Sequence, residues 1–144
     1  MKTAIIIDST SYVNEGLRNH PDVYELFLTT TFEDGTQFLD STDVKVQKDF
    51  YNKLQASDKL PTTSQPALGE YIALIEEIIE KGYDQLLCIH LSKTFSGTCQ
   101  TAKMLIDEYK DQINGHVVDS KGVSLIIGAL VEQALDMIEK EVPF

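Results

Sequence analysis

Two short segments gather hydroxyl and amide side chains where an anion could bind. One is PTTSQP at 61–66, directly before a strongly apolar helical pattern, and the other is LSKTFSGT at 91–98. A helix N-terminus offers unpaired backbone N–H groups and the positive end of a dipole, which suit a carboxylate or a phosphate. Ser64 and Ser96 stand where N-caps are expected, and one cap per helix is enough. The two segments contain more hydroxyl groups than helix capping requires, and this excess favours a binding role. The additional hydroxyl groups belong to Thr62, Thr63, Thr94 and Thr98.

Two carboxylates offer a different chemistry. Asp8 and Asp119 each follow an apolar run, so the pair could act as metal ligands or as a phosphoryl acceptor in a small phosphohydrolase or phosphotransferase. Two isolated carboxylates are a weak signal, and glycine-rich phosphate loops of the GxGxxG or GxxxxGK type are absent. His90 has no neighbouring acid or nucleophile in sequence and is expected to be a hydrogen-bonded interior residue. Cys88 and Cys99 match no zinc or redox spacing and are expected in the core. No metal and no cofactor are expected.

Alternating apolar runs and helical patterns must position these groups. Buried strands are expected at 3–7, 23–32, 84–92 and 115–120. Helices are expected at 13–18, 46–55, 68–80, 96–110 and 123–140. This alternation predicts a three-layer α/β domain with a small, mainly parallel sheet flanked by helices. Right-handed crossovers should then place four polar loops on one rim of the sheet, at 8–11, 61–66, 91–98 and 118–124.

The overall composition limits the class of protein. With 144 residues, of which 42% are hydrophobic, the chain suits one domain, expected to span 1–144. A formal net charge of −11 argues against nucleic acid or an anionic membrane surface as the main partner. No apolar stretch is long enough to cross a bilayer, and Asp8 interrupts the N-terminal run before a signal peptide could form. A cytoplasmic location without integral membrane contact is therefore expected.

Several segments together resemble the DegV family along nearly the whole chain. They include DST at 8–10, FEDG at 32–35, PTTSQPALGE at 61–70, IHLSKTFSGTCQTA at 89–102 and VVDSKGVSLIIG at 117–128. The resemblance implies a non-enzymatic protein that binds a long-chain fatty acid and presents its carboxyl group to a partner fatty acid kinase. It implies that Thr63 and Ser96 hydrogen-bond the carboxylate, each from the start of a helix. Secondary candidates are Thr62, Ser64, Ser92, Thr94 and Thr98.

The chain also departs from the family pattern. Lys93 and Thr94 stand where a serine and a glycine are common, and Cys99 replaces an aromatic residue. The geometry around the fatty acid carboxylate, or the preferred acyl chain, is therefore expected to differ from that of other family members. Family members usually continue into a second domain that closes over the ligand, and the chain resembles the N-terminal domain alone. Two alternatives therefore stay open beside fatty acid binding. One is the phosphoryl chemistry of Asp8 and Asp119, and the other is a truncated domain that binds no ligand.

Overall fold

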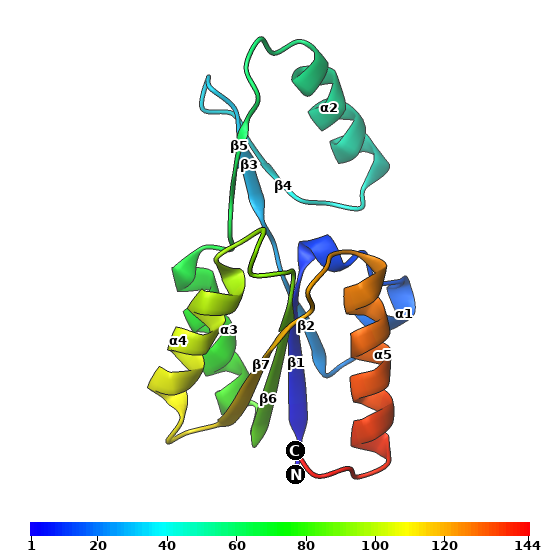
Figure 1. Cartoon of the computed structure of the whole chain (residues 1–144), viewed down its shortest axis with the longest axis vertical. Helices are drawn as coiled ribbons and strands as arrows, with labels where there is room; N and C mark the ends of the chain where they lie inside the picture. Colours follow the sequence, from blue (N-terminus) through cyan, green and yellow to red (C-terminus); the bar gives the residue numbers. More distant parts are fainter.

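A parallel sheet of four strands, in the order β2-β1-β6-β7, forms the centre of the molecule (Figure 1). The structure is a computed structural model that describes residues 1–144. Each neighbouring pair of strands runs in parallel register. The strands are β1 (Thr3–Asp8), β2 (Val23–Leu26), β6 (Gln85–His90) and β7 (Asn114–Asp119). The predicted α/β fold with a mainly parallel sheet is confirmed.

Helices cover both faces of this sheet. In Figure 1, α3 and α4 lie on one side of the strands, and α5 with the short α1 lies on the other. The helices are α1 (Glu15–Arg18), α3 (Leu68–Glu80), α4 (Thr98–Tyr109) and α5 (Leu125–Glu139), and a 3-10 turn, η1 (Ser9–Ser11), follows β1. Helical coverage on both sides explains why the strand sequences are continuously apolar instead of alternating.

Successive residues of β1 point into two separate cores. Ala4 and Ile6 pack with α3 and α4, around side chains such as Tyr71. Ile5 and Ile7 pack with α5, around side chains such as Ile127. All four β1 side chains are fully buried, and burying an isoleucine stabilises the fold by about 1.5–3 kcal/mol. The parallel direction of the strands brings their carboxyl ends together at one rim.

A second, smaller sheet stands beyond the carboxyl ends of the parallel strands (Figure 1). Its three antiparallel strands lie in the order β4-β3-β5, and α2 (Val44–Gln55) lies in the same segment of the chain. The strands are β3 (Thr29–Thr31), β4 (Gln37–Leu39) and β5 (Thr62–Ser64). We call residues 29–64 the lobe. The expected single strand at 23–32 is wrong, because the chain leaves the parallel sheet at Leu26 and enters the lobe at Thr29.

The lobe has its own small aromatic core. The rings of Phe32, Phe38 and Phe50 lie edge to face, with centroids 5.6–5.8 Å apart. Such pairs contribute about 0.5–1.5 kcal/mol beyond the area they bury. The hairpin that joins β3 to β4 turns at Gly35, whose φ of 83° suits glycine. The lobe is therefore a packed unit that projects from the sheet, and not a long disordered insertion.

Gly115 offers a test of how tightly α4 packs on β7. A Cβ added there would lie 2.3 Å from Cδ1 and 2.9 Å from Cγ2 of Ile106, a buried residue of α4. We expect Gly115→Ala to lower the free energy of unfolding by about 1–3 kcal/mol, because the crowded side chain has to move. The matched control is Gly69→Ala in α3, where a Cβ meets nothing within 4 Å. That change is expected to be neutral or to stabilise by about 0.5–1 kcal/mol. Equal urea midpoints for both variants would contradict this packing.

Candidate functional site

Three loops at the carboxyl ends of the parallel strands are joined by backbone hydrogen bonds. The N–H of Ser124 donates to the carbonyl of Thr10 (2.8 Å), and the N–H of Ser92 donates to the carbonyl of Gly122 (2.9 Å). The N–H of Ser120 donates to the carbonyl of His90 (3.1 Å). The loops at 8–11, 91–98 and 118–124 therefore meet at one rim, as expected from the parallel topology.

Asp8 is the buried centre of this rim. One carboxylate oxygen accepts hydrogen bonds from the N–H (3.1 Å) and the hydroxyl (2.5 Å) of Thr10. The other accepts from the N–H of Leu91 (2.9 Å) and from Nδ1 of His90 (3.0 Å). Burial raises the pKa of the Asp8 carboxyl, but these hydrogen bonds outweigh burial and hold the pKa below its ordinary value. Asp8 thus remains ionised and ties the end of β1 to the end of β6.

His90 lies fully buried between Asp8 and Tyr71. A carboxylate can only accept, so Nδ1 carries the proton, and Nε2 accepts from the Tyr71 hydroxyl at 2.7 Å. Burial raises the pKa of Tyr71 well above its ordinary value, so its hydroxyl stays protonated and able to donate. The expectation that His90 is a hydrogen-bonded interior residue is confirmed. The chain of contacts also anchors α3 to the rim.

Thr63 lies in the middle of β5, not at the start of a helix. The helix α3 begins at Leu68, and its N-cap Ala67 makes no side-chain capping bond. The helix predicted at 68–80 is confirmed, but the expectations that Thr63 stands at its start and that Ser64 caps it are wrong. The physical reason is local, because Pro66 disfavours helical geometry at the residue before it and β5 pairs with β3 in extended form.

The three hydroxyl groups of β5 point to alternate faces of the strand. Thr62 and Ser64 donate long hydrogen bonds to the carbonyls of Thr31 (3.5 Å) and Thr29 (3.4 Å). The hydroxyl of Thr63 makes no hydrogen bond within the protein, and its side chain is exposed. Of these candidates, Thr63 has the hydroxyl that is free to bind a ligand.

Ser96 lies one residue before the N-cap of α4. The cap is Gly97, so the expectation that Ser96 is the N-cap is wrong by one position. Its Oγ nevertheless accepts from the N–H of Thr98 (3.3 Å) and lies 2.8 Å from the Thr98 hydroxyl. If Thr98 donates in that contact, the Ser96 proton is available to an acceptor outside the protein. The helix α4 has 12 residues, and its positive end is close to this hydroxyl.

Gln65 brings the two polar segments together. Its side-chain amide donates to the hydroxyl of Thr101 in α4 (2.9 Å). A Cβ added to Gly97 would lie 2.8 Å from the Gln65 side-chain oxygen. The residue after β5 therefore rests directly on the start of α4, which places the segments of Thr63 and Ser96 side by side.

Of the remaining hydroxyl candidates, Ser92 and Thr98 have hydrogen bonds within the protein. Ser92 is buried, and its Oγ accepts from the N–H of Thr94 (3.2 Å). Thr98 is fully buried against Ser96. The side chain of Thr94 is exposed. These contacts shape the loop at 91–98 that carries Ser96.

Asp119 is not paired with Asp8. Its Oδ1 accepts from the N–H groups of Lys121 (3.0 Å) and Lys93 (3.3 Å) and so holds the turn after β7 against the loop after β6. Asp8 is fully buried and already accepts four hydrogen bonds. No group of three or more His, Cys, Asp or Glu side chains is arranged to hold a metal ion.

The chain matches one protein family over nearly its whole length. A family model described as "Uncharacterised protein, DegV family" matches residues 2–144. The chain belongs to the DegV family. A DegV domain-containing protein of Staphylococcus aureus is 37% identical over 140 residues, which cover 97% of this chain and 48% of the relative. Protein DegV of Bacillus subtilis is 33% identical over 140 residues, covering 96% of this chain and 48% of the relative. The chain thus spans about half the length of these DegV relatives.

Solved DegV structures share the fold over the whole chain. A fatty acid binding DegV family protein of Streptococcus agalactiae superposes with a TM-score of 0.90 at 32% identity, covering 100% of this chain and 50% of that one. A DegV lipid binding protein of Thermotoga maritima superposes at 0.87 with 28% identity and the same coverage. The fatty acid kinase B3 protein of Streptococcus pneumoniae, solved with linoleic acid, has a TM-score of 0.82 at 20% identity, covering 99% of this chain and 50% of that one. At that identity, the similarity concerns the fold alone.

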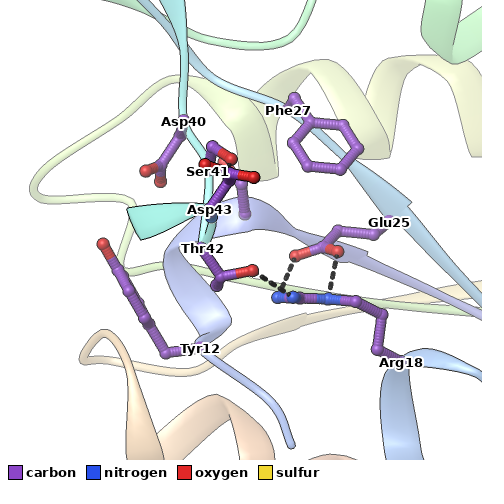
Figure 2. Close-up of a pocket in the computed structure, with 9 residues that line it drawn as sticks. Tyr12, Arg18, Glu25, Phe27, Asp40, Ser41, Thr42 and Asp43 are labelled. Carbon is purple, nitrogen blue, oxygen red and sulfur yellow. Dashed lines mark hydrogen bonds and ion pairs between the residues drawn. The ribbon is translucent and has the colours of Figure 1, made fainter. Parts of the chain in front are cut away.

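A polar pocket of the DegV chain, which the sequence did not indicate, lies beside α1, β2 and the loop before α2 (Figure 2). Arg18 of α1 pairs with Glu25 of β2, with Nε 2.9 Å from Oε2, and donates from a terminal nitrogen to the hydroxyl of Thr42 (2.7 Å). These contacts tie the body of the fold to the loop before α2. Arg18 is the only arginine in the chain, which was a signal available from the sequence.

No helix of this DegV structure combines the length and apolar character that crossing a membrane requires. The side chain of Thr63 is exposed, and that of Ser96 is half-buried.

Proposed function

We propose that the chain binds a long-chain fatty acid and takes no catalytic part in the chemistry of its carboxyl group. The observation that carries this proposal is the superposition on the fatty acid binding DegV protein of S. agalactiae, which covers 100% of this chain at a TM-score of 0.90. The sequence identity over this superposition is 32%. We further propose that the chain corresponds to the N-terminal domain of its relatives.

Thr63 and Ser96 are the proposed ligands of the carboxylate. Thr63 has a hydroxyl without an internal partner, and Ser96 can donate outward while it accepts from Thr98. The contact of Gln65 with Thr101 holds the two segments together. Hydrogen bonds to a charged acceptor contribute about 1.5–3 kcal/mol each, and the N-terminus of α4 adds a favourable dipole. The local geometry therefore suits an anionic head group better than a neutral one.

Exposed apolar side chains near the rim offer a surface for the acyl chain. Phe95 is 70% exposed in the loop that carries Ser96, and Leu125 is 80% exposed at the start of α5. Each CH₂ group removed from water stabilises the complex by about 0.8 kcal/mol. We propose that the first part of the acyl chain lies over these side chains.

The proposed macromolecular partner is a fatty acid kinase that phosphorylates the presented carboxyl group. Under this proposal the kinase supplies the catalytic residues. The phosphoryl chemistry considered for Asp8 and Asp119 has little support, since the first is buried with four donors and the second accepts two backbone hydrogen bonds.

Native mass spectrometry of the purified protein tests the proposal. We expect a bound species with the mass of a long-chain fatty acid, released on denaturing extraction. A matched fatty alcohol should bind at least about tenfold more weakly, because it lacks the charged acceptor. The protein should also not hydrolyse p-nitrophenyl phosphate in the presence of Mg²⁺. Failure to retain or bind any fatty acid would favour a domain without a ligand, and Mg²⁺-dependent hydrolysis lost in Asp8→Asn would favour the enzyme.

A further inference from the structure

A cleft between the lobe and the body of the fold lies beside the proposed carboxylate site. Neither Thr63 nor Ser96 lines the cleft, but Thr30 does, and Thr30 pairs with Thr63 across the small sheet. It consists of two adjoining cavities of about 370 and 340 Å³, which share Tyr12, Asp40 and Ser41 as a common wall. Each volume lies in the range of small-molecule sites. One cavity is lined mainly by polar side chains and the other mainly by aromatic and aliphatic ones. A ligand that fills both therefore needs a polar part and an apolar part.

The polar cavity is lined by one positively charged side chain, Arg18, and this side chain is already paired with a carboxylate. Figure 2 shows Arg18 held by Glu25 and Thr42 along the lower edge of this cavity. The Glu25 side chain is only 9% exposed, so the pair is partly shielded from water. Because its guanidinium is engaged on two sides, Arg18 cancels the charge of Glu25 and leaves little attraction for an added anion.

Asp40 is the carboxylate in the shared wall. It is half-buried, and no lysine, arginine or histidine lies within ion-pair distance of it. Burial raises the pKa of its carboxyl above the ordinary value, even though hydrogen bonding to Ser9 and Ser41 and the positive charge of Arg18 lower it. The negative charge of Asp8 also raises this pKa, and a bound cation would favour the ionised carboxylate. Asp43, on the same cavity, adds a second negative charge while it caps α2.

The aromatic cavity is lined by four ring side chains and by no lysine, arginine or histidine. Tyr12, Phe38, Phe50 and Tyr51 line it, and the Phe50 ring lies 5.6 Å from Phe38 and 5.2 Å from Tyr51. Cation–π contacts occur elsewhere in the chain, formed by Lys2, Lys53 and Lys81 with other rings. Aromatic faces beside an unpaired carboxylate attract positively charged groups.

We propose that this cleft binds an organic cation, in which an ammonium group is carried on an apolar or aromatic stem. The ammonium group lies against Asp40 and the face of Tyr12, and the stem occupies the aromatic cavity beside Phe50 and Tyr51. The excess negative charge of the cleft, within a chain of net charge −11, disfavours a carboxylate there. The cation site thus favours the opposite charge to the proposed carboxylate site, and neither Thr63 nor Ser96 lines it.

Nuclear magnetic resonance titration with benzyltrimethylammonium tests the proposal. In the ¹⁵N-labelled protein, the amide signals of Tyr12 and of residues 38–41 and 46–51 are expected to shift together in a saturable manner. Benzoate, a probe of similar shape and opposite charge, should not shift them. Asp40→Asn and Tyr51→Leu should each weaken the affinity about three- to tenfold.

The matched control is Asp49→Asn, which removes the same charge from an exposed position of α2 that lines neither cavity. It should leave the affinity unchanged. Tyr51 is 59% exposed, so Tyr51→Leu keeps the test valid even if Asp40→Asn disturbs the loop before α2. Three results would each overturn the proposal: no saturable shift at millimolar probe, equal shifts with benzoate, or the same affinity in Tyr51→Leu as in the parent.

Discussion

Replacing Ser96 with alanine is expected to weaken fatty acid binding by about one to two orders of magnitude. The change removes one hydroxyl donor to a carboxylate, and such a hydrogen bond contributes about 1.5–3 kcal/mol. Thr63→Val keeps the shape of the side chain and should have an effect of the same size. Isothermal titration calorimetry with a soluble medium-chain fatty acid measures both affinities.

The two substitutions should not be additive, because both hydroxyl groups act on the same carboxylate. Ser64→Ala is the matched control. Ser64 follows Thr63 on the opposite face of β5 and makes only a long hydrogen bond to the Thr29 carbonyl (3.4 Å). Its replacement should change neither the affinity nor the melting temperature appreciably. Parental affinity in both Ser96→Ala and Thr63→Val would show that the carboxylate binds elsewhere.

Asp8→Asn is expected to lower the free energy of unfolding by about 2–4 kcal/mol. The carboxylate of Asp8 is the acceptor in all four of its hydrogen bonds. An asparagine places its own amide donor against some of them, which leaves buried N–H or O–H groups without an acceptor, at about 1–3 kcal/mol for each group. Urea unfolding measures the change. The control is Asp119→Asn. Asp119 accepts only two backbone hydrogen bonds and is partly exposed, so this change should lower the free energy of unfolding by less than about 1 kcal/mol.

The effect of Asp8 on stability should depend on pH. Because the folded pKa of Asp8 is lowered, its contribution is fully present above the unfolded pKa, about 3.9, and is lost as pH falls through the folded pKa. The difference in unfolding free energy between the parent and Asp8→Asn should therefore be larger at pH 6 than at pH 3. A difference that is the same at both pH values would contradict an ionised Asp8 in the fold.

The parallel core could be predicted from the sequence because its signals are local. Continuous apolar runs such as the one before Asp8 occur where helices cover both faces of a sheet. The amphipathic pattern after Pro66 likewise indicated α3. The carboxyl ends of parallel strands share one edge, so the loops after β1, β6 and β7 could be placed together before their contacts were known.

The lobe could not be predicted in the same way. Its strands have three residues each, and Thr29–Thr31 pairs with Thr62–Ser64 across a separation of more than 30 residues. Threonine-rich segments of that length are equally typical of loops, so no local pattern distinguishes the strand that carries Thr63 from a loop before a helix. Nothing local identifies β4 or β5 as the strands that flank β3.

The network behind the site was also only partly visible. His90 was expected to be satisfied inside the protein, but its partners Asp8 and Tyr71 are distant in sequence and come from separate elements. Tyr71 followed the helical pattern of core residues and gave no sign of its hydroxyl contact. The pairing of Arg18 with Glu25 likewise depends on how α1 folds back on β2.

The most direct measurement is a crystal structure of the protein with a bound fatty acid. We expect both hydroxyl groups, those of Thr63 and Ser96, to lie within about 2.5–3.0 Å of carboxylate oxygens of one fatty acid molecule. The acyl chain is expected to begin over Phe95. A fatty acid whose carboxylate lies away from both residues, with their hydroxyl groups unchanged by the ligand, would show that Thr63 and Ser96 do not bind the carboxylate.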